Sequence, residues 1–111
     1  MKYYLLLLNR KIDIKLKKSV TIDYELDWGS RIKSNYAIEY VTDKILNIFE
    51  ENSAKATFFV SGEILSSSKS FVKTIHNAKH EIASHGYEHN IKYDLLSKDE
   101  LYTQISKSKF E

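Results

Sequence analysis

Apolar positions along the chain follow two alternating patterns. Short runs of apolar and β-branched residues, typical of β-strands, alternate with longer segments in which apolar residues recur every three or four positions, as on one face of an α-helix. The expected strands are residues 3–8, 12–16, 19–24, 55–60 and 81–84. The second of these has charged residues between its apolar ones, so one of its faces is expected to be solvated.

Three amphipathic helices are expected between and after these strands. The first covers about residues 36–52, with Ser34 or Asn35 as its cap. The apolar face of the second helix contains Phe71, Val72, Ile75 and Ala78. The third helix begins at Ser97, and Glu100 three residues later completes the pattern of a capping box.

The order of these elements from residue 19 onward is strand, helix, strand, helix, strand, helix. This order favours an α/β fold with a parallel sheet and right-handed crossovers. In such sheets, binding and catalytic residues gather at the carboxyl ends of the strands. The residues that follow Ile22 and Ser84 are therefore the first places to look for chemistry.

Composition limits the kinds of protein that this chain could be. A length of 111 residues with 42% hydrophobic and 29% charged residues is typical of one globular domain. The absence of cysteine excludes disulfide scaffolds, zinc fingers, iron–sulfur clusters and thiol catalysis, so any metal must bind through His, Asp or Glu. A formal charge of +2 is too small to indicate a nucleic-acid partner.

The amino-terminal segment begins like a signal peptide. Its apolar run, residues 3–8, is short, whereas a signal peptide needs about 7 to 15 apolar residues and a membrane span about 20. We therefore expect a buried strand there, no membrane span and a cytoplasmic protein.

Three carboxylates follow the strand at residues 19–24. Asp23, Glu25 and Asp27 lie two residues apart, so in an extended segment they point to the same side. A solvated acidic strand end would explain them without any function. The functional alternative is a carboxylate set that requires a cation or a proton to offset its charge.

Two histidines follow the strand at residues 81–84. His85 and His89 are four residues apart, which in one helical turn would place both imidazoles on a common face, within reach of a single ion. Surface histidines are the ordinary explanation for such a pair. Together with a carboxylate from the neighbouring strand, however, the pair would form a ligand set that leaves positions open for water and substrate.

Four other aromatic or imidazole residues near these segments have less specific expected roles. His76 and His80 are expected to be structural or exposed. Trp28 and Tyr87 flank the carboxylates and histidines, where they could stack on a sugar ring or simply pack in the core.

Three segments of the chain resemble motifs of the polysaccharide deacetylases with a NodB-type domain, carbohydrate esterase family 4. Residues 23–29, Asp-Tyr-Glu-Leu-Asp-Trp-Gly, resemble the first motif in its Asp-x-Glu variant. Residues 56–62, Ala-Thr-Phe-Phe-Val-Ser-Gly, resemble the second barrel strand, and residues 80–89 resemble the second motif, with Lys79 where Gly is usual. The resemblance covers residues 19–111, and residues 1–18 form a separate amino-terminal segment of strands.

The resemblance implies a hydrolase that removes acetyl groups from amino sugars with the help of a divalent metal, usually zinc. By position, Asp23 would be the general base, and Glu25, His85 and His89 would be the metal ligands. Asp27 is an alternative ligand to Glu25. The ion would polarise the acetyl carbonyl and lower the pKa of water, while Asp23 takes the proton from the attacking water.

The length of the chain differs from that of the family's domain, a distorted (β/α) barrel of about 200 residues. We therefore expect the N-terminal portion of such a barrel, truncated after the second motif, without the later motifs that supply the general acid. The expected partner is an acetylated carbohydrate, and residues 1–111 alone are expected to be weakly active. The alternative is a nonenzymatic α/β fragment that binds metal or carbohydrate and pairs with itself or a complementary chain through exposed strand edges.

Overall fold

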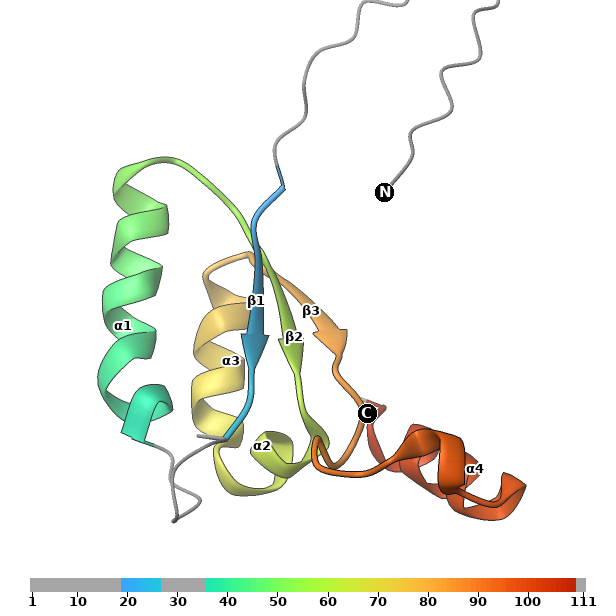
Figure 1. Cartoon of the computed structure of the whole chain (residues 1–111). Coiled ribbons are helices and arrows are strands. Elements are labelled where there is room, and N and C mark those ends of the chain that lie inside the picture. Colours follow the sequence, from blue (N-terminus) through green and yellow to red (C-terminus); the bar gives the residue numbers. More distant parts are fainter. Residues whose placement is uncertain (1–18, 27–35, 110–111) are drawn as a thin grey trace, which may run out of the picture.

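A parallel sheet with helices packed against one face forms the centre of the computed structural model, which describes residues 19–26 and 36–109 (Figure 1). The elements in chain order are β1 (Thr21–Tyr24), α1 (Tyr36–Glu51), β2 (Thr57–Val60), α2 (Gly62–Ser67), α3 (Lys69–Asn77), β3 (Glu81–Ser84), the 3₁₀ turn η1 (Tyr93–Leu95) and α4 (Lys98–Lys107).

The sheet has the order β1-β2-β3 in this part of the chain, and both strand pairs are parallel. Asp23 lies beside Phe59, and Phe59 lies beside Ala83. The parallel α/β arrangement expected from the sequence is confirmed. β3 has the predicted limits, and β1 and β2 are shorter than predicted. The strands expected at residues 3–8 and 12–16 lie outside the described residues.

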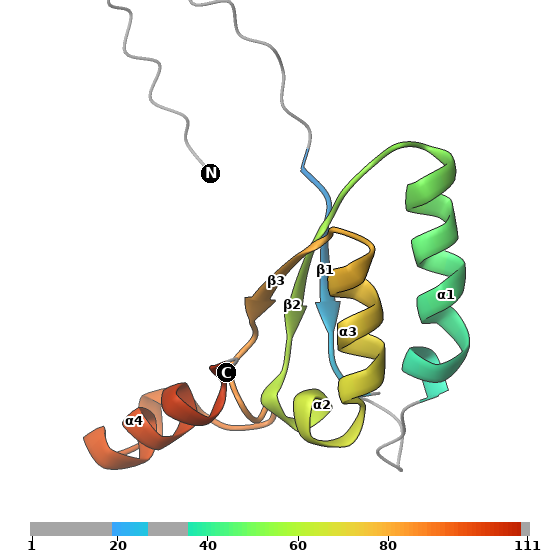
Figure 2. The ribbon, with the colours of Figure 1, turned by 180° about the vertical axis from the view of Figure 1, so that it is seen from behind.

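Helices α1 and α3 cover the same face of the sheet (Figure 2). Side chains alternate along β2, so that Phe58 and Val60 are buried under the helices while Thr57 and Phe59 are half-buried on the other face. The buried core consists of Tyr24, Ile38, Leu46, Ala56, Phe58, Val60, Ile64, Val72 and Ile75. Because both strand pairs are parallel, the carboxyl ends of β1, β2 and β3 lie at one edge of the sheet.

A buried hydroxyl pair links β1 to α1 within this core. The hydroxyl of Tyr24 and Oγ1 of Thr42 are 2.7 Å apart. Thr42 donates its proton to the carbonyl of Ile38, so the Tyr24 hydroxyl must be the donor to Thr42. Burial is the main cause that raises the pKa of Tyr24.

The helices agree with the predicted periodicity, with one addition. α1 and α3 occupy the expected segments, and the capping box of α4 is formed: the Ser97 N–H donates to Glu100 Oε2 (2.8 Å), and the Glu100 N–H donates to Ser97 Oγ (3.3 Å). The caps expected at Ser34 or Asn35 lie outside the described residues. α2 was not predicted, because its glycine and serines are poor helix formers.

Candidate metal centre

Three potential ligands meet at the carboxyl edge of the sheet. Glu25 immediately follows β1, His85 immediately follows β3, and His89 lies four residues further on. Nε2 of each histidine is 3.2 Å from the same carboxylate oxygen, Oε2 of Glu25. One ligand atom from each of the three residues lies within 4.8 Å of the other two. The strand order thus brings together residues that are far apart in the sequence.

The local conformation of the histidine pair differs from the sequence prediction. The sequence predicts one helical turn from His85 to His89, but the residues between them form a loop. Gly86 has φ 78°, a left-handed conformation that glycine adopts without strain. A Cβ on Gly86 would lie 2.4 Å from the Tyr93 hydroxyl oxygen. The imidazoles still stack, with ring centroids 5.3 Å apart and ring planes at 29°.

The geometry of these atoms fits a divalent ion. Glu25 Oε2 and His85 Nε2 are buried and neither forms a hydrogen bond within the described part of the chain. An ion between them would satisfy both. Ligand atoms on a tetrahedral zinc ion with bonds of about 2.0 to 2.1 Å lie about 3.3 to 3.4 Å apart, close to the observed 3.2 Å.

The exposure of the ligands leaves one side of the group accessible. The side chains of Glu25 and His85 are 21% and 25% exposed, and that of His89 is 42% exposed. Imidazole and carboxylate are ligands that zinc accepts, and open positions are a property of catalytic rather than structural zinc sites.

The remaining predicted site residues on the first motif are placed differently. Asp23 lies on β1 with its side chain exposed, while the next residue, Tyr24, is buried, as strand alternation requires. Asp23 is not part of the close group of ligand atoms. Asp27, the alternative ligand, and Trp28 lie outside the described residues.

The other two histidines are not near this edge. His80 is 5% exposed, and its Nδ1 accepts a hydrogen bond of 3.1 Å from the Ala56 N–H. Burial, assisted by the charge of Lys55, lowers the pKa of His80. His76 is exposed in the last turn of α3, which leads to the opposite edge of the sheet. The structural or exposed roles expected for both are consistent with these positions.

The start of α2 supports the loop between the ligands. The Gly62 N–H donates to the carbonyl of Gly86 (2.9 Å), and the Glu63 N–H donates to the carbonyl of Tyr87 (3.2 Å). The Tyr87 ring packs against Gly62, and the Lys107 amine lies 5.4 Å from the ring centroid. Sequence reasoning did not assign Gly62 a role, although a glycine directly after a strand end is a recognisable signal of close approach.

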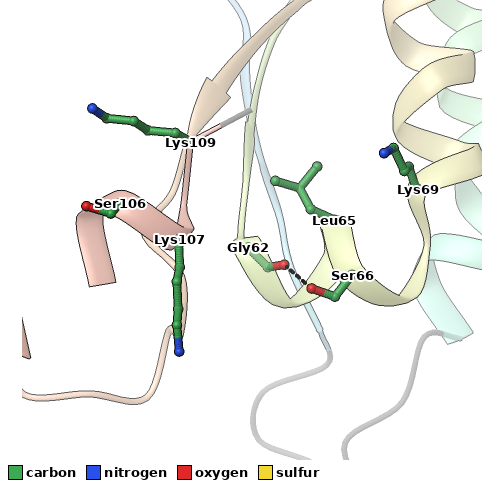
Figure 3. Close-up of a pocket in the computed structure, with 7 residues that line it drawn as sticks. All are labelled: Gly62, Leu65, Ser66, Lys69, Ser106, Lys107 and Lys109. Atoms are coloured by element: carbon green, nitrogen blue, oxygen red, sulfur yellow. Dashed lines mark hydrogen bonds between the residues drawn. The ribbon is translucent and has the colours of Figure 1, made fainter. Parts of the chain in front are cut away.

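A separate pocket of about 460 Å³ lies between α2 and the end of α4 (Figure 3). Its lining residues are Gly62, Leu65, Ser66, Lys69, Ser106, Lys107 and Lys109. None of the three candidate ligands lines it. Figure 3 shows that the three lysine amines point in different directions and do not converge.

In the described residues, no helix combines the length and apolar character required to cross a bilayer.

Comparison with known protein families identifies the class of protein. The sequence profile of the polysaccharide deacetylase family matches residues 16–111. The chain therefore belongs to the polysaccharide deacetylase family. Its described fold is a portion of the NodB-type (β/α) barrel found in the family's solved structures. Comparison with curated protein sequences gives no match.

Two similar structures have different activities according to their descriptions. The Bc1960 peptidoglycan N-acetylglucosamine deacetylase is 31% identical, with a TM-score of 0.64; the match covers 81% of this chain and 36% of that one. BA3943 from Bacillus anthracis, described as a CE4 family pseudoenzyme, is 34% identical, with a TM-score of 0.61, covering 84% of this chain and 30% of that one. A mutant of BA3943 is described as having restored enzymatic activity. This chain thus spans about a third of the length of each of these structures.

Proposed function

We propose that this chain carries the metal-binding part of a hydrolase that removes acetyl groups from the amino sugars of a polysaccharide or a sugar intermediate. The observation that supports it is the convergence of Glu25, His85 and His89 on one point at the carboxyl edge of the sheet. Membership of a deacetylase family supports the reaction type. A cytoplasmic location is part of the proposal.

The proposed reaction assigns a role to each of four residues. Water adds to the acetyl carbonyl carbon, the carbon–nitrogen bond breaks, and acetate and a free amine are released. Asp23 takes a proton from the attacking water. Glu25, His85 and His89 hold a divalent ion, proposed to be Zn²⁺, which when bound supplies polarisation of the acetyl carbonyl and a lowered pKa for water.

We also propose that residues 1–111 alone have little activity. The leaving amine needs a proton, and a positioned acid contributes about 10²- to 10⁴-fold. Two of the four histidines are the proposed ligands. His80 is buried in the core and His76 lies towards the opposite edge of the sheet. Neither is placed to protonate an amine beside the ligands.

Calorimetric titration with zinc tests the metal site. We expect one ion per molecule, and we expect replacement of both His85 and His89 by Ala to remove most of the affinity. His76→Ala is the matched control, because His76 is an exposed histidine outside the group. A double variant that binds zinc as tightly as the parent would show that the ligand assignment is wrong.

Acetate release from an acetylated chito-oligosaccharide tests the reaction. We expect slow release that depends on zinc and is reduced further in Asp23→Asn. Turnover at ordinary enzyme rates, roughly 1 to 10³ per second, that disappears in Asp23→Asn would contradict the proposal that the acid is lacking.

A second candidate is a nonenzymatic fragment that binds metal or carbohydrate and pairs with another chain. The likeness to a structure described as a pseudoenzyme favours this alternative. It predicts zinc and glycan binding without acetate release, and a change in oligomeric state when a complementary chain is added. Zinc-dependent acetate release by the purified chain would contradict it.

A further inference from the structure

The loop that carries His89 is held at both ends by different elements. We define the histidine loop as residues 85–89. Its first half is fixed by backbone contacts: the His85 N–H donates to the carbonyl of Val60, and the first two N–H groups of α2 bind the carbonyls of Gly86 and Tyr87. These contacts orient His85 but end before His89.

The second half of the histidine loop is held by side chains from outside it. Oε1 of Gln104, on α4, accepts a hydrogen bond of 3.3 Å from the Glu88 N–H. The Tyr93 hydroxyl, on η1, makes a longer contact of 3.4 Å with the Glu88 carbonyl. The two contacts therefore hold the peptide groups on both sides of Glu88, the residue directly before His89.

We propose that Gln104 is a positioning residue for the metal centre, acting through the Glu88 peptide to orient His89. This inference rests on the proposed function. His89 is the most exposed of the three candidate ligands, at 42%, so packing restrains it least. Gln104 binds the peptide before Glu88, and Tyr93 contacts the peptide between Glu88 and His89. Together they restrict the backbone angles of Glu88, which set the position and direction of His89.

Gln104 has features that suit this role. Its side chain is half-buried, in contrast to its exposed neighbours on α4, Thr103 and Ile105. Its partner is 16 residues away in the sequence, so the contact serves no purpose within the helix. The Glu88 N–H is part-buried, and a buried donor without an acceptor is unfavourable. Residues that orient metal ligands through hydrogen bonds commonly change metal affinity by about 10- to 100-fold when replaced.

The test compares zinc affinity among four forms of the chain. Gln104→Leu keeps the approximate size of the side chain and removes the acceptor, so we expect its zinc dissociation constant to rise about tenfold. Gln104→Glu keeps an oxygen at the same distance along the side chain, so it should bind zinc within about twofold of the parent by the same reasoning. Thr103→Val is the control, since the Thr103 hydroxyl donates to the Asp99 carbonyl within its own helix, α4.

Measurements on the metal-free and cobalt-loaded chains separate positioning from general stability. Metal-free Gln104→Leu should retain the parent's circular dichroism spectrum, while the visible spectrum of its Co²⁺ form should change because one imidazole is less well placed. If the parent binds zinc and Gln104→Leu binds it equally well, this inference is wrong and the proposed function stands. An equal loss of affinity in Gln104→Glu or in Thr103→Val would also overturn it. Failure of the parent to bind zinc would instead overturn the proposed function.

Discussion

Gly62 is the residue at which a single added methyl group should test the architecture of the site most directly. In Gly62→Ala, the new Cβ would lie 2.2 Å from Cδ2 and 3.0 Å from Cα of Tyr87. Carbon atoms in contact are normally about 3.5 Å or more apart, so the ring atom would have to move by about 1.3 Å. Because the Cα atom is also crowded, rotation of the ring alone does not relieve the contact, and the histidine loop must shift.

The expected energy follows from two opposing effects. Overpacking of this kind typically costs about 1 to 3 kcal/mol. Alanine is favoured over glycine inside a helix by at most about 1 kcal/mol, and Gly62 is the first residue of α2. We therefore expect a net loss of about 1 to 2 kcal/mol. For a domain of this size, each kcal/mol corresponds to a fall in Tm of roughly 4 to 8 °C.

Thermal unfolding of the metal-free chain, followed by zinc titration, checks this prediction. Tyr87 lies between the two histidine ligands, so displacement of its backbone should also weaken zinc binding by about tenfold or more. Ser67→Ala is a suitable control, because it adds an alanine to the same helix at an exposed position. If Gly62→Ala melted with the parent and bound zinc equally well, the histidine loop would not depend on its close contact with α2.

Four further predictions concern the core and the helix ends. Thr42→Val removes the acceptor of the buried Tyr24 hydroxyl, so the free energy of unfolding measured in urea should fall by about 1 to 3 kcal/mol. Thr42→Ser keeps a hydroxyl and should cost clearly less. Equal costs for the two variants would contradict the hydrogen-bond argument. Because the pKa of His80 is lowered in the folded chain, this histidine binds a proton more readily in the unfolded chain as pH falls through about 6.5. The parent should therefore lose more stability between pH 7.5 and 5.5 than His80→Asn, and parallel Tm curves would contradict this. Lys79 has φ 65° directly after α3, so Lys79→Gly should raise stability by about 1 kcal/mol and Lys79→Ala should not. Ser97→Ala should destabilise α4 by about 1 kcal/mol, observed as lower helicity and a lower Tm.

The fold could be predicted from the sequence where periodicity and local chemistry agree. The β-branched run of β1, the apolar spacing of α1 and the Ser97 capping box each depend on neighbouring residues only. α2 could not be predicted in this way, because its glycine and serines do not favour a helix. A tertiary contact explains the position of α2: its first two N–H groups donate hydrogen bonds to carbonyls of the histidine loop.

The proximity of Glu25 to His85 and His89 could be predicted from the sequence, but the local geometry could not. A parallel strand order predicts that residues after β1 and β3 share one edge of the sheet, and Glu25 does lie beside His85 there. The spacing of the histidines predicts a helical turn, but Gly86 turns the chain in a left-handed conformation instead. Gln104 was not recognised, because a polar residue on an amphipathic helix is ordinarily solvated, and nothing local indicates its contact with Glu88.

The position of the ligands directly after β1 and β3, the outer strands of the described sheet, has a consequence for the motions of the sheet. β1 and β3 do not pair with each other, because β2 lies between them. An ion held by Glu25 and His85 would be a direct cross-link between these two strands, in addition to the hydrogen bonds through β2. Binding of the ion should therefore reduce local opening at the ends of both strands, and hydrogen exchange of the β1 amides would report this change. A free zinc concentration of 100 times the dissociation constant would also stabilise the folded chain by about 2.7 kcal/mol. Because the ion would bind residues after both β1 and β3, this stabilisation would oppose the unfolding of either strand.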